Sequence, residues 1–514
     1  MATDLPIRPT RDEFLARAAG GANLIPLSIE LIADGETPIG AFQKLLDEDA
    51  AIGPGGGHTF LLESAEQAEG IGRYSFMGFR PAAVFEARGR EIRVTERGQT
   101  RSFTTQSDPL TELQALMARY RSAVDPALVA VPFVGGAVGY LGYEMTRFFE
   151  PTLPEPPPDD LRLPDALFMI TDTLLVFDHR HRRLRVIVNV LLDETAPDAA
   201  LAYEAAVARL SQLVHRLGQP GNLRPTRVWP ELDGKSTAAS NTTRAEYEDM
   251  VRRGQEHILA GDIFQFVPSQ RFEAAYDGPP LALYRALRFV NPSPYMFHLQ
   301  FGPKLAFVGS SPEVHVRALD DRVEIRPIAG TRKRGPTPGE DAALAAELLA
   351  DPKERAEHLM LVDLARNDVG RVTNFGTVRV TDFMRVERYS HVMHLVSDVV
   401  GKLRPGLTSY DVMRATFPAG TVTGSPKVRA MQIISDFEKS KRGFYAGAVC
   451  YFGFDGNLDS CIALRSVVLQ DGKAYVQAGA GVVADSVPSS EYEETVSKAA
   501  GVLRALDLAR QMVD

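Results

Sequence analysis

The sequence predicts an α+β protein whose sheets are mainly antiparallel. Strand-like runs and helical segments alternate irregularly in the second half of the chain, and many strands follow one another with no helix between them. A doubly wound parallel sheet would need a crossover connection, usually a helix, between its strands. At 514 residues, the chain is long enough for two or more cores or for one large elaborated domain.

Composition limits the kinds of molecule that this protein can bind and the cellular compartment in which we expect it. The net charge of −9 argues against nucleic acid as the main partner, and it allows a small anion only where a pocket is locally basic. No apolar run is long enough to span a membrane, and the first residues lack the apolar core of a signal peptide. Cys450 and Cys461 stand far from any metal-binding or redox spacing. We therefore expect a cytoplasmic protein with neither a nucleic-acid nor a membrane partner.

In the first half of the chain, one hairpin and one boundary can be predicted. Residues 173–190 read as two strands around a basic turn, which predicts a β-hairpin with a solvated tip. A polar, proline-bearing stretch at 219–243 predicts a linker between an N-terminal region at 12–218 and a C-terminal region at 244–514.

The C-terminal region opens with a helix signal, and a sharply turning strand follows later. Thr243, with Glu246 three residues later, predicts a capped helix that runs to about residue 260. A strand-like run that begins at Arg326 breaks at Gly330 and Thr331. Because glycine at such a break lets backbone N–H groups approach an anion, this turn is a candidate anion-binding site.

Beyond an acidic, alanine-rich spacer, a helix carries the first candidate metal ligands. Spacings of three and four residues place Glu354, Glu357 and Leu361 on one side, and His358 is adjacent. A solvated face is the usual fate of such charged residues. The next two turns are almost wholly apolar, however, and carboxylates beside a buried stripe need a cation or a hydrogen-bond donor. We therefore expect at least one of these side chains to be functional.

A second group of carboxylates lies near the C-terminus. Glu491, Glu494 and Lys498 fall on one helical face, and on the residues alone an ordinary ion pair between Glu494 and Lys498 is the simpler interpretation. The loop before this helix adds three candidate backbone amides, those of Gly479, Ala480 and Gly481. Two clusters of oxygen ligands with few other candidates suit Mg²⁺, which keeps waters and bridges to an oxyanion of a substrate.

Two further side chains are candidates by their setting. Arg465 lies in an apolar, strand-like run, where an arginine generally points towards a buried or liganded anion. His391 and His394 are three residues apart, but no other ligand stands at a metal-binding spacing, so we expect at most one of them to be functional.

Taken together, these segments resemble the chorismate-utilising enzymes, specifically the anthranilate synthase component I family. The resemblance covers nearly the whole chain and rests on ordered motifs, among them LLESAE, IGRYSF, NPSPYMF, GSSPE, PIAGTR, AEHLMLVDLARND, HVMHLVS, FPAGTVTGSPKVRAM, FYAGAV, CIALRS, QAGAGVVADS and ETVSKA. It implies largely antiparallel sheets packed as a sandwich with outer helices. It also implies amination of chorismate by ammonia, then elimination of pyruvate, as the first committed step of tryptophan biosynthesis.

The resemblance separates this chain from neighbouring branches at two positions. Ala329 stands where aminodeoxychorismate synthases carry a nucleophilic lysine, and Gln265 stands where isochorismate and salicylate synthases carry a lysine that activates water. Both differences favour ammonia as the nucleophile. Cys450 is a departure, since the family usually has glycine there. The rival interpretations are an aminodeoxychorismate synthase, a tryptophan sensor that has kept the fold, and a metal-dependent hydrolase.

The resemblance also implies a role for each candidate residue. Mg²⁺ would be held by Glu357 and Glu494, with Glu354 and Glu491 in support. The substrate carboxylates would be bound by Gly330, Thr331, Tyr445, Arg465, Gly479, Ala480, Gly481 and Lys498. The catalytic set would be Glu313 as general acid, His394 and Thr421 in pyruvate elimination, and Gln265.

Feedback and a partner follow from the same resemblance. Tryptophan would bind at Leu62, Glu63, Ser64, Pro294, Tyr295 and Met296, which makes 12–218 a regulatory region and 244–514 the catalytic one. Neither cysteine has the glycine-flanked setting of an amidotransferase nucleophile. We therefore expect a separate glutamine amidotransferase subunit that supplies ammonia within a hetero-oligomer.

Overall fold

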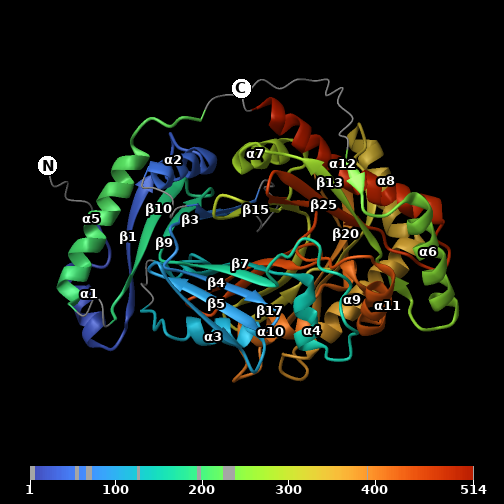
Figure 1. Ribbon diagram of the computed structural model, residues 1–514, viewed down its shortest axis with the longest axis horizontal. Helices are drawn as coiled ribbons and strands as arrows, with labels where there is room; N and C mark the ends of the chain where they lie inside the picture. The colour runs from blue at the N-terminus through green and yellow to red at the C-terminus, as the bar shows by residue number, and fades with distance from the viewer. Residues whose placement is uncertain are drawn as a thin grey trace.

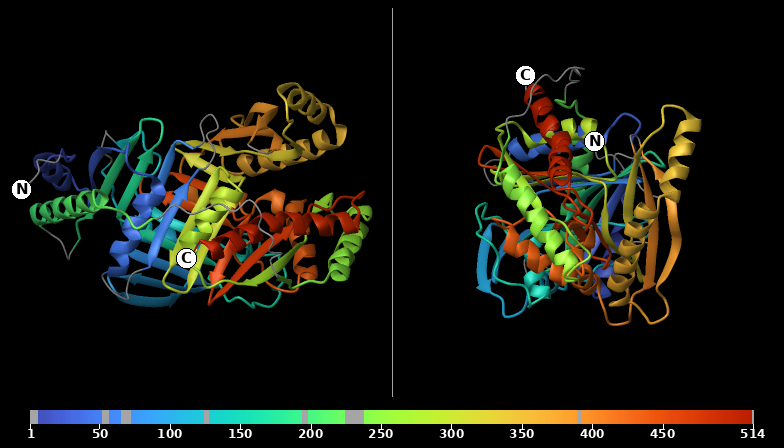
Figure 2. Two further views of the ribbon diagram at one scale, coloured as in Figure 1. Left: turned by 90° about the horizontal axis from the view of Figure 1, so that it is seen from above. Right: turned by 90° about the vertical axis from the view of Figure 1, so that its right-hand side faces the viewer.

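The computed structural model describes residues 6–51, 57–64, 72–123, 128–193, 198–223, 238–389 and 392–512. Two large sheets form facing layers with helices on their outer sides (Figure 1), and Figure 2 shows the same layers from two further directions. In the described part of the chain, no helix is both long enough and apolar enough to cross a membrane.

The first sheet has eleven strands among the described residues, and all of its pairings are antiparallel. In spatial order they are β1 (Leu24–Ile32), β10 (Arg183–Leu191), β9 (Thr173–Asp178), β3 (Tyr74–Phe79), β2 (His58–Glu63), β14 (Tyr295–Phe301), β15 (Leu305–Ser311), β24 (Ser466–Gln470), β25 (Lys473–Gly479), β13 (Ser269–Ala275) and β11 (Ala239–Ser240).

The second sheet has twelve strands within the described ranges, again all antiparallel. Their order is β18 (Ile328–Lys333), β20 (Val392–Lys402), β17 (Arg322–Ile325), β16 (Val314–Leu319), β23 (Leu458–Ile462), β22 (Ala448–Gly453), β7 (Gly136–Leu141), β8 (Ala166–Thr171), β4 (Ala83–Arg88), β5 (Glu91–Glu96) and β6 (Gln99–Thr104), with β19 (Arg379–Arg388) paired to β20. A separate short ladder joins β12 (Gln265–Phe266) to β21 (Gly424–Ser425).

Side-chain alternation along the strands fills a core on each face of the sheets. Phe297 of β14 and Tyr140 of β7 belong to the core between the two layers. Met296, the neighbour of Phe297, faces the opposite core beneath the outer helices, because successive side chains in a strand point to opposite faces. Burial on both faces explains why every position of β8 is buried.

The helices divide between the two outer surfaces. The outer core of the first sheet includes residues of α1 (Arg11–Ala19), α2 (Pro38–Ala51), α5 (Ala199–Leu217), α7 (Pro280–Val290) and α12 (Pro488–Gln511). The outer core of the second includes α3 (Pro109–Met117), α9 (Pro352–Gly370) and α10 (Ser409–Thr416). The remaining α-helices are α4 (Thr146–Phe149), α6 (Arg244–Leu259), α8 (Pro338–Ala350) and α11 (Lys427–Phe437), and a short 3₁₀ turn, η3, spans Gly420–Val422.

The predicted α+β class with largely antiparallel sheets is confirmed. The hairpin is β9–β10, with Asp178 paired to Arg183. The capped helix is α6, in which the Thr243 hydroxyl accepts from the Glu246 N–H and the Glu246 side chain accepts from the Thr243 N–H. The stretch taken as a spacer is itself helical, because α8 occupies most of it.

Each large sheet contains strands from both sides of the predicted linker. The first sheet takes five strands from before it and the second takes β4 to β8 from the same region. The division into 12–218 and 244–514 therefore does not separate the sheets. It separates only the predicted roles, regulatory for the first region and catalytic for the second. It stays a prediction, and residues 224–237 of the linker lie outside the described residues.

Candidate active site

The turn at Gly330 is a bulge in β18 that holds a histidine. The register of β18 against β20 shifts between Ala329 and Thr331, and Gly330 has a φ of +67°, a left-handed value that favours glycine. The Gly330 carbonyl oxygen lies 2.8 Å from Nδ1 of His394, and because a carbonyl oxygen only accepts, Nδ1 carries the proton. Burial lowers the pKa of His394, which favours the neutral ring and leaves Nε2 free to act as a base.

Four carboxylates on two helices lie near enough for their charges to interact, and one of them reaches this turn. Glu354 and Glu357 lie on α9, and Glu491 and Glu494 lie on α12. A Cβ atom at Gly330 would lie 3.0 Å from Oε2 of Glu354, which places the Glu354 carboxylate against the bulge. Burial raises the pKa of Glu357, and the charges of Glu354 and Glu494 raise it further. A cation between the two helices would relieve this repulsion.

The donor set of the cluster suits Mg²⁺, since it consists of hard carboxylate oxygens. Within the described ranges, no three His, Cys, Asp or Glu side chains are gathered tightly enough to coordinate one ion. Two members of the cluster are engaged elsewhere: Glu354 Oε1 lies 2.9 Å from Arg332 Nη1, and Glu494 Oε1 lies 2.6 Å from Lys498 Nζ. The second contact is the ion pair that the sequence alone indicated, and a cation would have to compete with Lys498 for this carboxylate.

The loop after β25 brings three of the predicted substrate-binding residues together. A Cβ atom at Gly479 would lie 2.8 Å from the Tyr445 hydroxyl oxygen. Lys498 reaches from α12 to the Gly479 carbonyl oxygen, at 3.0 Å. The Ala480 N–H donates to the Pro268 carbonyl oxygen at 3.2 Å. The amide of Ala480 is therefore occupied, and it does not belong among the bare amides that the sequence indicated.

Gln265 lies on the other side of this loop. It is buried in β12, and its Nε2 atom lies 2.7 Å from the position that a Cβ atom at Gly481 would occupy. The register of β12 against β21 pairs Gln265 with Ser425, a few residues after Thr421. The glycine at 481 is what leaves room for the amide of Gln265.

Arg465 differs from its predicted setting. It stands between β23 and β24 at a φ of +48°, so the strand-like run is broken at this residue. Burial lowers the pKa of Arg465, while Tyr445, Glu494 and Glu313 act in the opposite direction. The guanidinium is thus close to the groups expected to bind substrate, and burial strengthens its need for an anion.

Glu313, between β15 and β16, has the protonation state that a general acid requires. Burial raises the pKa of its carboxyl group to about 7, and the nearby Thr421, Lys498 and Arg465 act in the opposite direction. A substantial fraction of this carboxyl group is therefore protonated at neutral pH. The Ile462 N–H donates to the Glu313 backbone carbonyl at 3.1 Å, which fixes this residue beside β23.

A separate cavity of about 450 Å³ is lined by all six residues predicted to bind tryptophan. They are Leu62, Glu63, Ser64, Pro294, Tyr295 and Met296. Cys450, Arg317 and Asp459 also line it. The Tyr295 hydroxyl donates to Asp459 Oδ1 at 3.0 Å, and Arg317 Nε lies 3.2 Å from the same oxygen. The sequence pattern did not indicate this charged wall.

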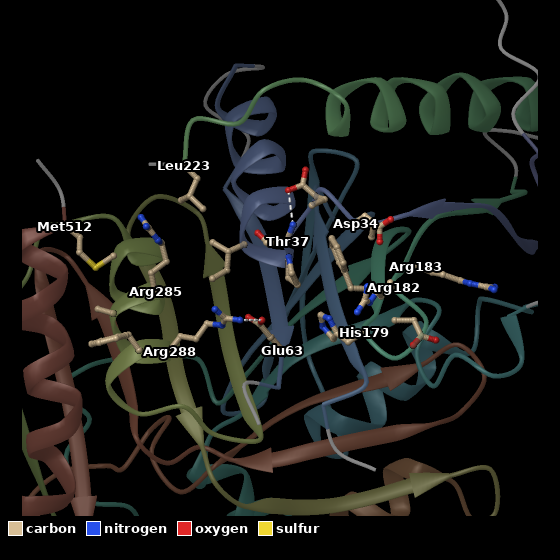
Figure 3. Close-up of a pocket in the computed structure, with 18 of the residues that line it drawn as sticks. Asp34, Thr37, Glu63, His179, Arg182, Arg183, Leu223, Arg285, Arg288 and Met512 are labelled. Atoms are coloured by element: carbon tan, nitrogen blue, oxygen red, sulfur yellow. Dashed lines mark hydrogen bonds and ion pairs between the residues drawn. The ribbon is translucent and has the colours of Figure 1, made fainter. Parts of the chain in front are cut away.

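The carboxylate of Glu63 is engaged on the opposite side of β2. It accepts from the Tyr284 hydroxyl at 2.7 Å and pairs with Arg288 at 3.0 Å, both on α7. Figure 3 shows Glu63 and Arg288 in contact in a neighbouring cavity of about 660 Å³. The expected attraction of this carboxylate for an amino group is therefore already satisfied by Arg288.

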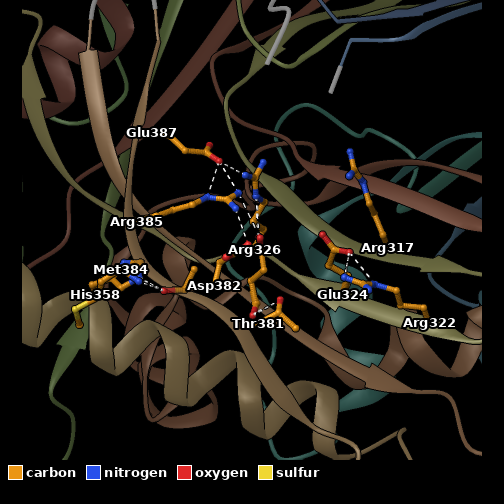
Figure 4. Close-up of polar contacts among 12 residues, drawn as sticks. Arg317, Arg322, Glu324, Arg326, His358, Thr381, Asp382, Met384, Arg385 and Glu387 are labelled. Carbon is orange, nitrogen blue, oxygen red and sulfur yellow. Dashed lines mark hydrogen bonds and ion pairs between the residues drawn. The ribbon is translucent and has the colours of Figure 1, made fainter. Parts of the chain in front are cut away.

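Two residues of the stretch at 326–368 are used in packing rather than in this site. His358 Nε2 lies 2.7 Å from the Ser397 hydroxyl, and that hydroxyl accepts from the Met384 N–H at 2.9 Å (Figure 4). Arg326 is buried and pairs with Asp398 at 2.9 Å. Of the three polar residues grouped on α9 by sequence, only the two glutamates join the carboxylate cluster.

Comparisons with known proteins bear on the whole chain. Residues 57–504 match the family described as chorismate binding enzyme. The anthranilate synthase component 1 of Aquifex aeolicus is 46% identical over 499 residues, which cover 97% of this chain and 98% of that protein. The protein of the same name from Pseudomonas putida is 46% identical over 506 residues, which cover 98% and 99%.

The chain belongs to the chorismate-binding enzyme family. The crystal structure of anthranilate synthase component I from Streptococcus pneumoniae matches this structure with a TM-score of 0.73 at 37% identity, covering 85% of this chain and 93% of that one. The resemblance read from the motifs, including its anthranilate synthase branch, is thereby confirmed. The roles of individual residues stay predictions.

Within this chorismate-binding enzyme, sequence reasoning missed Arg442 and Glu438. Their side chains form an ion pair of 2.7 Å and are only 1% and 6% exposed. The segment from 438 to 442 reads EKSKR, a charge run that is typical of a solvated loop. No local signal distinguishes this pair, because its partners come from distant parts of the chain.

Proposed function

We propose that this chain is the large subunit of an anthranilate synthase, a lyase that converts chorismate and ammonia to anthranilate and pyruvate through 2-amino-2-deoxyisochorismate. Its near full-length similarity to proteins named anthranilate synthase component 1 supports the activity. The observation that carries the choice of nucleophile is Gln265, which is buried in the site and has no basicity with which to activate water. The reaction would be the first committed step of tryptophan biosynthesis.

Substrate binding rests on a local positive field in a protein of net charge −9. Arg465, Lys498 and the Tyr445 hydroxyl bind the two carboxylates of chorismate. When held by Glu357 and Glu494, with Glu354 and Glu491 in support, Mg²⁺ would neutralise the ring carboxylate and stabilise charge that develops there.

Two proton transfers by the chain's own residues complete the reaction. As ammonia forms its bond to C2 and the ring double bonds shift, Glu313 gives its proton to the C4 hydroxyl, which leaves as water. The new C2 ammonium then loses one proton to solvent, and Glu313 regains one from solvent. In the second step His394 Nε2 takes the proton from C2, the ring becomes aromatic, and the enolpyruvyl group leaves and is protonated to pyruvate. Thr421, near Glu313 in the same pocket, would assist His394 in this second step.

Regulation and ammonia supply complete the proposal. Tryptophan would occupy the 450 Å³ cavity and favour an inactive arrangement, and by reciprocity chorismate would weaken tryptophan binding by the same factor. The name component 1, carried by the relatives, supports a second component. We assign that component as a glutamine amidotransferase subunit that delivers ammonia in a hetero-oligomer.

The test is anthranilate fluorescence from the purified chain with chorismate, Mg²⁺ and ammonium, with and without tryptophan. We expect fluorescence that tryptophan suppresses, and no fluorescence when glutamine replaces ammonium. Ser64→Phe, which would fill part of the 450 Å³ cavity, should make anthranilate but escape suppression. A folded, chorismate-binding protein that makes no anthranilate would contradict the activity, and unchanged inhibition of Ser64→Phe would contradict the tryptophan site.

A further inference from the structure

Arg442 contacts the backbone of two segments that carry candidate catalytic residues. Its side chain is 1% exposed. Nη1 donates to the Val422 carbonyl oxygen at 2.8 Å, and Nη2 donates to the Val267 carbonyl oxygen at 2.6 Å. Val422 directly follows Thr421, and Val267 lies two residues after Gln265. One guanidinium group therefore ties together segments that are far apart in the sequence.

Glu438 extends this contact to a third segment. Its two carboxylate oxygens accept from Arg442 Nε at 2.9 Å and from Nη2 at 2.7 Å, a two-point pairing that fixes the plane of the guanidinium. One of these oxygens also accepts from the Ser269 N–H and hydroxyl, each at 2.8 Å. Ser269 pairs with Gly479 across β13 and β25, so the network reaches the loop proposed to bind substrate.

The guanidinium also lies over two aromatic rings. Its central carbon is 4.8 Å from the centre of the Tyr143 ring and 5.6 Å from that of Tyr445. A cation over an aromatic face is attracted to it, and this attraction grows where water is excluded. Arg442 therefore packs against Tyr445, whose hydroxyl is proposed to bind a substrate carboxylate.

Stability alone does not require this arrangement. A buried ion pair loses hydration energy that its attraction barely recovers, and well-packed apolar residues often replace such a pair with no loss. Donors aimed at several separate segments give something an apolar residue does not, namely a fixed geometry between those segments. We infer that Arg442, oriented by Glu438, is a positioning residue for the proposed reaction and sets the segments of Gln265, Thr421, Gly479 and Tyr445 against one another.

This inference rests on the proposed function, and its test separates the two. Arg442→Lys keeps the charge, but an ammonium group lacks the planar fork needed to reach both carbonyls and Glu438. We expect kcat with ammonium to fall by about 10- to 100-fold, because small displacements of catalytic groups cost this much. The dissociation constant for tryptophan, measured with the same protein, should stay within about twofold because that cavity lies outside the network.

A second variant covers the case in which a buried lysine prevents folding. The pair Arg442→Met with Glu438→Gln removes both charges together, so no unpaired charge is left buried. This double variant should fold and bind tryptophan, but its kcat should fall by at least as large a factor as that of Arg442→Lys. The matched control is Arg414→Met with Asp108→Asn, a pair at 3.3 Å that joins α10 to α3 outside the site, and its kcat should not change.

The outcomes are distinct. The double variant of Arg442 and Glu438 is assayed well below its unfolding temperature. If it is folded and its kcat is within twofold of wild type, the positioning role is overturned, even if the variant is less stable to heat. If the wild-type chain makes no anthranilate, the proposed function fails instead. In that case the positioning role of Arg442 is tested by chorismate binding. Both Arg442 variants should bind chorismate more weakly, and the control pair should not. Equal binding in all of these proteins would overturn the positioning role.

Discussion

At the scale of single residues, Glu313 offers a test of the acid step. Burial raises the pKa of its carboxyl group to about 7, so the protonated, donating form declines as the pH rises through this value. A bound dianionic substrate would raise that pKa further. At saturating chorismate and ammonia, we therefore expect kcat of the wild type to fall on the alkaline side of neutrality. In Glu313→Gln, kcat should fall about 10²- to 10⁴-fold and lose this alkaline decline.

The comparison of the two pH profiles is valid only if the titration of Glu313 is distinguished from that of the substrate ammonia and of other residues. Ammonia becomes more available as the pH rises, so rates are compared only where more ammonium no longer increases them. Circular dichroism and tryptophan binding confirm that the variant is folded. An alkaline decline of the same position and steepness in Glu313→Gln would assign it to another residue and remove Glu313 as the acid.

Single residues also show where sequence information ends. Glu357 and Glu494 could be proposed because spacing on a helix is local, and the structure brings both to one cluster. Arg465 was placed in a strand, whereas it adopts a φ of +48° that depends on contacts at both ends of its loop. Arg442 was not identified, because its burial depends on a carbonyl that stands 175 residues away in the sequence.

At the scale of secondary-structure elements, the bulge in β18 at Gly330 contacts both Glu354 of α9 and His394 of β20. We expect Gly330→Ala to lower the free energy of unfolding by about 1–3 kcal/mol, because alanine is strained at a left-handed φ. Its Cβ atom would also lie 3.0 Å from Glu354 Oε2 and from Leu348 Cδ1. Since the Gly330 carbonyl anchors His394, kcat should fall as well, by about tenfold or more.

Gly376→Ala separates strain from function. Gly376 has a φ of +77°, close to that of Gly330, but a Cβ atom there would meet nothing within 4 Å. Urea unfolding should show a loss of stability in both variants, smaller in Gly376→Ala because only backbone strain acts there. Only Gly330→Ala should lose activity with ammonium. Full activity in Gly330→Ala would show that the bulge does not position His394.

Elements defined by local signals were predicted well. The β9–β10 hairpin and the capped start of α6 follow from strand alternation and from Thr243 and Glu246, which need no distant partner. The helix α8 was missed although a cap is present, since the Thr337 hydroxyl accepts from the Glu340 N–H. An alanine-rich, acidic stretch was taken as a spacer because its apolar face is narrow. The pairing order of the sheets, which interleaves both halves of the chain, has no local signal at all.

At the scale of the whole molecule, the outer core of the first sheet binds the two halves of the chain together. His298 of β14 lies in its interior and is fully buried. Its ring centre is 5.3 Å from that of Phe42 on α2 and 6.2 Å from that of Tyr284 on α7. Neither ring nitrogen has a hydrogen-bond partner among the described residues. A titratable group without partners at the junction of both halves makes global stability sensitive to acid.

We expect His298→Leu to reduce the loss of stability in acid. Burial lowers the pKa of His298 from 6.5 to about 4, so below pH 6.5 the unfolded chain takes up a proton that the folded chain refuses until about pH 4. The free energy of unfolding therefore falls as the pH drops through this window, by about 2 kcal/mol from this residue at about pH 5. Urea midpoints measured at about pH 7.5 and about pH 5 should differ less in His298→Leu than in the wild type. His215→Leu, at an exposed position on α5, should keep the wild-type difference, and an equal acid loss in all three proteins would show that His298 does not control it.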